Sequence, residues 1–340
     1  MKIFERVKEI DYRYIKIFGI KIYDRYIEDE YVYSKILFGL FVKRKEIKIK
    51  RKELFVLGIR VYKSPIEEVL LKNLRSLHRD VKYLKIKHNM ELAIARQHTK
   101  VFPQFKHANE GRTVALIATG PTMNYYNPAD DVVQIGVNKA FKRKDLNLKY
   151  WFAIDYFATR DLIEDLKSKD FYKFFGQCSS SNTDHIYVKF KEEPEYYCFP
   201  DSVIESVPNS FKFYMDHPSK EMNRDIETQA LPDFSSCVFS ALSFALYSGA
   251  KKIYIVGCDC AMNGYFDKTS QIACWNINNL ISSWTIVKDY LAIFHPEVEV
   301  VSVNPVGLKG YFKDVYTESY LEANPKVRKE LGDNIEILKG

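Results

Sequence analysis

The sequence has no apolar run that approaches the roughly 18 residues of a membrane span. Residues 1–8 have neither the apolar core nor the small-residue cleavage site of a secretory signal. These two absences predict a cytoplasmic protein. None of the six cysteines forms a Cys-x-x-Cys pair. Cys258 and Cys260, at the end of an apolar run, are therefore expected to be buried reduced thiols rather than a metal or redox pair.

The motifs of several common enzyme classes are also absent. The chain has no Gly-x-Gly-x-x-Gly and no Gly-x-x-x-x-Gly-Lys-Ser/Thr, which argues against an NAD-type site and a P-loop NTPase. It has no Gly-x-Ser-x-Gly nucleophile elbow. No Asp-x-Asp follows a predicted strand, and no His/Cys cluster has metal-ligand spacing. Chemistry without a metal or other cofactor is therefore favoured.

The charge that is present is unevenly distributed. The chain has 51 Lys+Arg and 44 Asp+Glu, a net charge of +7. Residues 1–100 hold 25 of the basic and 13 of the acidic residues, a net of +12, which leaves −5 for the remainder. Such asymmetry predicts an anionic partner for the N-terminal 100 residues. A membrane surface is favoured over nucleic acid, because no nucleic-acid-binding signature is present.

Three similar segments near the N-terminus predict a small repeated β-structure over residues 1–63. Each has apolar residues, one glycine, and then alternating apolar and basic residues, which is typical of short strands joined at a tight bend. The segments are 15–23, 35–43 and 54–63, with central glycines Gly19, Gly39 and Gly58. This hairpin array is either an accessory sheet with solvated lysines or a platform for an anionic membrane surface.

Residues 64–110 are expected to form a helix and a linker. Pro65 opens a helix over 66–98, and the linker follows at Pro103 and 106–111. Apolar residues at 4-3-4-3 spacing build one seam along the helix; they are Leu70, Leu74, Leu77, Val81 and Leu84. Packing of this seam against the protein's own body is favoured over a coiled-coil dimer, and a homo-oligomer remains the alternative.

Residues 111–325 alternate between strand and helix patterns, which predicts an α/β fold with a doubly wound, mainly parallel sheet. Residues 326–340 are expected to be a C-terminal tail. The predicted strands are 114–118, 132–137, 150–154, 171–177, 252–256 and 298–303. The predicted helices include 158–169, 236–248 and 282–294.

Polar and small residues follow these strands, where such a fold binds its ligand. They are Thr119, Gly120 and Thr122; Asn138 and Lys139; Asp155; residues 178–182; and Asp259, Asn263, Gly264 and Tyr265. Ser235 and Ser236 begin a predicted helix, where hydroxyls and free N–H groups cap the helix or hold an anion. Because these groups recur at one edge of the sheet, a shared ligand site is favoured over a set of unrelated turns.

In this order, these residues resemble the bacterial sialyltransferases of glycosyltransferase family 42. They also resemble the related motility accessory factors and hydroxymethylpterin pyrophosphokinases. The sialyltransferases have Asn-Gly-Pro-Ser, Cys-Asn-Gln, Cys-Ser-x-x-Asn with a nearby His, Thr-Ser, and Ser-Gly-Ile-Asp followed by Asn-Gly. The matching residues here are 119–122, 137–139, 178–182 with His185, 235–236, and 256–259 with 263–264. The resemblance covers roughly residues 112–305.

The resemblance implies a Rossmann-like, modified GT-A-like fold and a metal-independent, inverting glycosyltransferase. The donor would be a CMP-activated acidic sugar, sialic-acid-like, and the acceptor a saccharide or glycolipid of lipopolysaccharide or capsule, at the inner membrane face. The implied donor-binding residues are Thr119, Gly120, Thr122, Asn138, Lys139, Asp155, Ser235, Ser236, Asp259, Asn263 and Gly264, and Tyr265 would help the departing phosphate. The alternatives are a pyrophosphokinase-like transferase and a non-catalytic nucleotide-binding module.

The sequence departs from the family at the general base. The family's His lies before its last helix, but residues 275–284 contain no His. The Arg before the family's Thr-Ser pair is replaced by residues 233–234, Asp-Phe. An inverting transfer needs a base beside the acceptor hydroxyl. The candidates are His185, Asp155, Asp259 and Asp267, of which His185 is favoured.

Overall fold

The computed structural model describes most of the chain after residue 64 and the paired strands before it. The described residues are 4–8, 12–17, 20–28, 31–36, 41–46, 52–56, 59–63, 65–179, 198–216, 219–262, 264–268, 277–333 and 335–338. The chain divides into two compact units, Met1–Ile86 and Lys87–Gly340. None of the described helices combines the length and apolar character needed to cross a bilayer.

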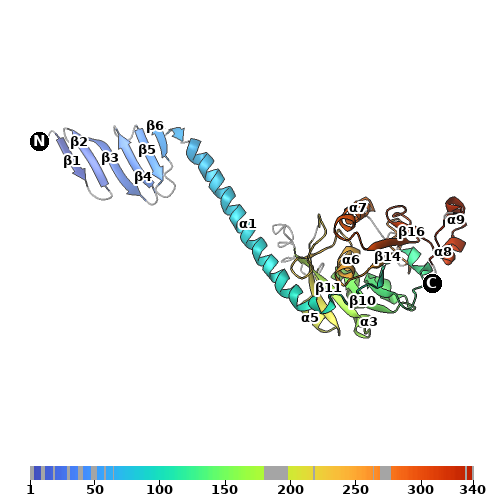
Figure 1. The fold of residues 1–340 in the computed structure, drawn as a ribbon. Coiled ribbons are helices and arrows are strands. Elements are labelled where there is room, and N and C mark those ends of the chain that lie inside the picture. Colours follow the sequence, from blue (N-terminus) through green and yellow to red (C-terminus); the bar gives the residue numbers. More distant parts are fainter. Residues whose placement is uncertain are drawn as a thin grey trace. The chain divides into compact units, whose positions relative to one another are not determined.

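The described strands of the first unit form a seven-stranded antiparallel sheet in which the spatial order follows the chain (Figure 1). They are β1 (Phe4–Lys8), β2 (Tyr12–Ile17), β3 (Ile20–Glu28), β4 (Tyr31–Ile36), β5 (Phe41–Glu46), β6 (Lys52–Val56) and β7 (Ile59–Lys63). Each of the three sequence repeats coincides with one hairpin, β2–β3, β4–β5 or β6–β7. The predicted β-repeat is therefore confirmed.

A single helix, α1 (Pro65–Val101), follows the sheet and contains the boundary between the two units. Its C-terminal part belongs to the second unit, where Ile94, His98 and Val101 are buried. The described apolar residues of the predicted seam, in contrast, are exposed. Leu74, Leu77, Val81 and Leu84 are between 56% and 61% exposed, not buried as the preferred interpretation of the seam required.

In the described part of the second unit, nine strands form one sheet, and every strand pair in it is parallel. The spatial order is β13-β12-β11-β10-β9-β8-β14-β15-β16, so the direction of winding reverses between β8 and β14. The strands are β8 (Thr113–Ile117), β9 (Val133–Val137), β10 (Leu148–Ala153), β11 (Tyr172–Ser179), β12 (Ser210–Asp216), β13 (Leu231–Pro232), β14 (Lys252–Val256), β15 (Glu299–Val303) and β16 (Lys313–Val315). This is the predicted doubly wound, Rossmann-like fold.

Helices cover both faces of this sheet (Figure 1). Alternate residues of β8 enter opposite cores, because successive side chains of a strand point to opposite faces. Val114 and Leu116 join the core with α6 (Cys237–Tyr247) and α7 (Ile277–Phe294). The other core contains Ala115 and Ile117. It also includes residues of α3 (Ile163–Lys167) and α5 (Asp201–Glu205). Burial on both faces explains why the strand is apolar throughout.

Several elements differ from the sequence prediction. The helix predicted over 158–169 is divided into α2 (Tyr156–Thr159), a 3-10 turn and α3. Thr159 interrupts it, with φ −121° and ψ −6°, and its hydroxyl donates to the carbonyl of Asp155 at 2.5 Å. The tail predicted over 326–340 contains most of α9 (Pro325–Leu331), which follows α8 (Glu318–Ala323). A parallel bridge pairs Ile337 with Tyr316, so this segment is tied to the unit.

A buried histidine predicts how the stability of the second unit depends on pH. His98 donates from Nδ1 to the carbonyl of Ile226 (2.8 Å), and its Nε2 accepts from the N–H of Tyr214 (2.7 Å). Both contacts together require the neutral ring. Burial lowers the pKa of His98 from 6.5 to about 4. Because the unfolded chain takes up this proton first as pH falls, the stabilisation is complete above pH 6.5 and is lost progressively toward pH 4.

We expect the free energy of unfolding to fall by about 3 kcal/mol over this window, at about 1.4 kcal/mol per pH unit. Denaturant titrations followed by tryptophan fluorescence measure this, since all three tryptophans lie in the second unit. His98→Gln should lower stability at pH 7 but remove this part of the slope. An unchanged slope in the variant would show that other groups cause it.

Candidate functional site

The candidate site lies where β8 and β14 end side by side, at the reversal of the sheet's winding order. Open α/β sheets bind ligands at this point, outside the carboxyl ends of the strands. Backbone hydrogen bonds extend the pairing past both strands. The N–H of Ala118 donates to Val256 and that of Gly120 to Gly257, both at 2.8 Å. The loops after the two strands are therefore held against each other.

Asp259 ties these two loops together. Its carboxylate accepts from the backbone N–H of Thr122 at 3.2 Å and from the hydroxyl of the same residue. Asp259 is 4% exposed and Thr122 is also 4% exposed, so the pair is shielded from water. The carboxylate that was predicted to bind the donor also holds the Thr122 turn in place.

Two glycines allow this close approach. A Cβ on Gly120 would lie 2.5 Å from the carbonyl oxygen of Gly257 and 2.6 Å from the carboxyl carbon of Asp259. Gly257 itself has φ +66°, a left-handed conformation that glycine adopts without strain. A side chain at either position would force the loops apart.

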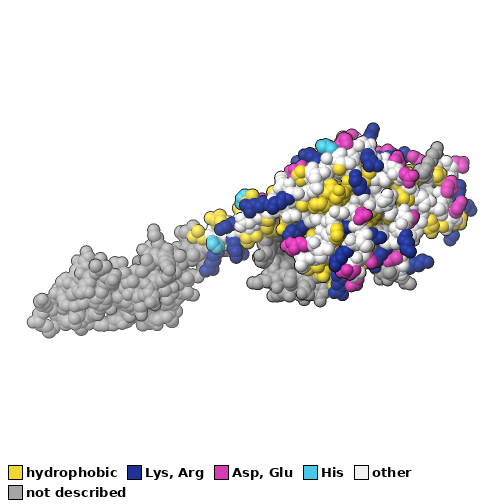
Figure 2. Space-filling model, turned by 90° about the horizontal axis from the view of Figure 1, so that it is seen from below, with side chains coloured by type: hydrophobic (Ala, Val, Ile, Leu, Met, Phe, Trp, Pro, Cys, Tyr) yellow, Lys and Arg dark blue, Asp and Glu magenta, His cyan; other side chains and the backbone are white. Residues whose placement is uncertain are grey.

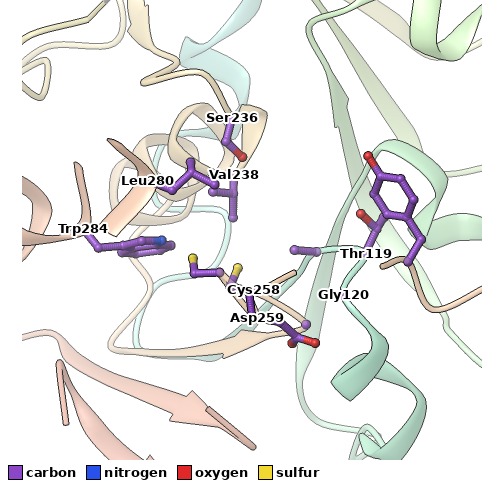
Figure 3. A pocket seen from close by; sticks show the side chains of 13 residues that line it. Thr119, Gly120, Ser236, Val238, Cys258, Asp259, Leu280 and Trp284 are labelled. Carbon is purple, nitrogen blue, oxygen red and sulfur yellow. The ribbon is translucent and has the colours of Figure 1, made fainter. Parts of the chain in front are cut away.

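A pocket opens between these loops and the helices α6 and α7 (Figure 3). Thr119, Gly120 and Asp259 lie on one side of it, and Ser236, from the start of α6, lines it as well. The apolar side chains of Val238, Leu280 and Trp284 line it too, together with Cys258 and Cys260 from the loop after β14. The cavity is about 90 Å³, below the ~300–1,000 Å³ of typical small-molecule sites. It can hold one moiety of a nucleotide sugar, and a whole donor would extend beyond it.

The turn that leads into α6 is unusual. Phe234 and Ser235 both have positive φ, at 38° and 65°. The N–H of Ser235 donates to the carboxylate of Asp233 at 3.2 Å, and the N–H of Ser236 donates to the backbone carbonyl of Asp233 at 2.5 Å. Strained backbone of this kind is held in place by its surroundings and is common at ligand sites. It leads into the start of α6, which has no side-chain cap hydrogen bond and whose Ser236 and Val238 line the pocket.

Asn138 and Asp155 lie next to this helix start. Asn138 has φ 48°, its carbonyl accepts from the indole N–H of Trp151 at 2.6 Å, and its Oδ1 accepts from the thiol of Cys237 at 3.4 Å. Burial raises the pKa of Cys237 to about 12, so the thiol keeps its proton. The charge of Asp155 contributes to that rise in pKa. Asp155 also caps α2 by accepting from the N–H of Ala158 at 3.1 Å.

Lys139, Tyr265 and Asp267 form a second polar group at the site. The ammonium of Lys139 lies 5.8 Å from the ring centre of Tyr265 and 3.9 Å from a carboxylate oxygen of Asp267. Tyr265 lines the pocket directly. Gly264, beside it, has φ +82°. Lys139 thus supplies a cation close to the pocket wall.

Two predicted site residues, His185 and Asn263, lie outside the described residues, as does most of the 178–182 motif. Among the residues that the structure describes, no three His, Cys, Asp or Glu side chains are grouped to hold a metal. Val238, Leu280 and Trp284 had no predicted site role, because the sequence pattern of apolar residues on a helix face is the same whether they line a pocket or fill a core. Asp233 was not predicted as the residue that shapes the turn before α6 either.

Comparisons with known proteins give a single, distant likeness to report. No family model matches the sequence, and no curated protein matches it. Among solved structures, the chain is similar to the sialyltransferase CstII from Campylobacter jejuni in complex with a substrate analogue, CMP-3FNeuAc. The two share 10% sequence identity with a TM-score of 0.34, over 60% of this chain and 85% of that one. Because the likeness is this weak, the proposal below rests on the residues and strand order of this chain.

Proposed function

We propose that the second unit is a glycosyltransferase that transfers a sialic-acid-like sugar from a CMP-activated donor to a saccharide or glycolipid acceptor, without a metal and with inversion. One observation carries the proposal. The sheet reverses its winding between β8 and β14, and the loops after these strands enclose a pocket that the first turn of α6 also lines. A strand-end crevice with helix N–H groups suits a phosphate and the groups attached to it.

Five residues at or beside the site have proposed roles in this reaction: Ser235, Ser236, Lys139, Asp155 and Tyr265. The N–H groups at the start of α6, with the Ser235 and Ser236 hydroxyls, receive the donor's phosphate or carboxylate. Lys139 offsets its negative charge. In an inverting transfer a base removes the acceptor proton as the hydroxyl oxygen attacks the anomeric carbon, and CMP leaves. We assign the base to Asp155 among the described residues, and protonation or hydrogen bonding of the departing phosphate to Tyr265.

The acceptor side of the proposal involves the first unit. Residues 1–86 hold 22 Lys+Arg and 12 Asp+Glu, a net charge of +10, so this unit would attach to an anionic membrane surface beside a lipid-linked acceptor. Each basic residue near such a surface contributes about 1 kcal/mol, so part of this charge is sufficient for peripheral attachment. Attachment would bring the second unit close to its acceptor.

Thermal unfolding with different nucleotides tests the proposal. At about 100 times its Kd, CMP should stabilise the chain by about 2.7 kcal/mol and raise Tm by about 5–11 °C. Stabilisation by ATP with Mg²⁺, and none by CMP, would contradict the proposal and support the pyrophosphokinase-like alternative. Because Asp259 is engaged by Thr122, a module that binds without catalysis is the second candidate. It predicts that a CMP-sugar donor binds but is neither hydrolysed nor transferred.

A further inference from the structure

The middle of α1 presents an apolar stripe to solvent. Leu74, Leu77, Val81 and Leu84 are 60%, 59%, 56% and 61% exposed. Figure 2 shows hydrophobic side chains lying among lysines and arginines on the described part of this helix. Single exposed leucines are ordinary, but four on one helix face mark an interaction surface.

This stripe is not the face by which α1 joins the second unit. At about 100° per residue, Ile94 and Val101 lie about 120° and 140° around the helix from the centre of the stripe. Both are buried, at 7% and 5% exposure. The exposed stripe and the two buried residues therefore lie on different faces of α1.

The spacing of the stripe is that of a coiled-coil seam. With Leu74 at heptad position a, Leu77 takes d, Val81 the next a, and Leu84 the next d. A seam restricted to a and d fits one partner helix, whereas a helix lying in a membrane interface has a wider apolar face. Val81, at the second a position, is β-branched and both d positions are leucine, an arrangement that favours two strands; Leu74, at the first a position, is not β-branched.

The charges beside the seam fit a second copy of the same helix. Asp80 occupies a g position and Lys85 the e position of the following heptad, and both are exposed. In a parallel, in-register pair of helices, the residue at position g of one helix lies beside the residue at position e of the following heptad on the partner helix. Asp80 of each copy then meets Lys85 of its partner. Arg79, at the outward-facing f position, takes no part.

We propose that α1 pairs with α1 of a second copy as a parallel two-stranded coiled coil centred on residues 74–84. This interaction is independent of the proposed transferase activity. The acidic Asp80 beside the seam also disfavours an anionic membrane as the partner of this face.

Light scattering of the full-length chain at micromolar concentration tests the pairing. The wild type should have twice the single-chain mass of 39.9 kDa. Leu77→Lys should be monomeric. Asp80→Lys and Lys85→Asp each place like charges together twice per dimer, and each should raise the dimer Kd by about tenfold or more. An equimolar mixture of these two variants should recover the dimer, because both cross pairs are then attractive.

Arg79→Glu is the matched control, since it changes charge on the outward face and should leave the mass at that of the dimer. Circular dichroism verifies that every variant keeps its helix. A monomeric wild type would overturn the proposal. The proposal would also be overturned if the mixture of Asp80→Lys and Lys85→Asp stayed monomeric. A third outcome would assign the stripe to a membrane. The chain would then be monomeric in solution and would float with anionic vesicles, and both Leu77→Lys and Arg79→Glu would abolish the flotation.

Discussion

Asp155→Asn is expected to lower the turnover number for sugar transfer by about 10²–10⁴-fold, the usual contribution of a positioned general base. Asparagine keeps the size of the side chain and caps a helix as well as aspartate does. The bond to the N–H of Ala158 can therefore remain. The change removes the carboxylate's ability to accept a proton and little else.

The expected signature is selective. Tm and the stabilisation by CMP should stay within error of the wild type, while transfer measured by release of CMP from the donor falls. His185→Asn is the informative companion, because it removes the other favoured base. If Asp155→Asn keeps full turnover and His185→Asn loses it, the base is His185 and our assignment is wrong.

The strands that flank the site could be predicted because they are buried on both faces. β14 was predicted with its observed bounds, and β8 within one residue, since each reads as an uninterrupted apolar run. β12 was missed. It lies near the edge of the sheet, where only the two-residue β13 pairs with its outer side, and most of its side chains are only partly buried. The apolar and polar residues of β12 therefore do not form a pattern clear enough to predict a strand.

The site residues could be predicted individually but not their partnerships. Thr119, Gly120, Ser236, Asp259 and Tyr265 were all predicted from their place after a strand or before a helix, and they line one pocket. Thr122 and Asp259 are 137 residues apart in the sequence, so no local sequence pattern predicts the hydrogen bond between them. The spacing of the α1 seam also could not show whether the seam is buried, because a heptad pattern is the same in a packed helix and in an exposed one.

Asp259→Asn is expected to destabilise the second unit and to abolish binding of CMP. Hydrogen bonds to a charged acceptor contribute about 1.5–3 kcal/mol each, and Thr122 makes two to this carboxylate. An asparagine is neutral, so its oxygen can accept from the Thr122 N–H while its NH₂ group donates to the Thr122 hydroxyl, and both bonds lose the assistance of the charge. We expect a loss of about 3 kcal/mol and a fall in Tm of about 6–12 °C, measured by tryptophan fluorescence.

A double-mutant cycle separates this bond from other effects of the substitution. Thr122→Val removes the hydroxyl and keeps the backbone donor, so it should cost less than Asp259→Asn. The double variant should then be more stable than the sum of the two single losses predicts, by about 0.5–3 kcal/mol. Asp267→Asn is the control on an exposed carboxylate, whose ion pair with Lys139 should contribute no more than about 1 kcal/mol. Additive losses would mean that Asp259 does not hold the Thr122 turn. The pocket wall would then depend on backbone hydrogen bonds such as those from Ala118 to Val256 and from Gly120 to Gly257.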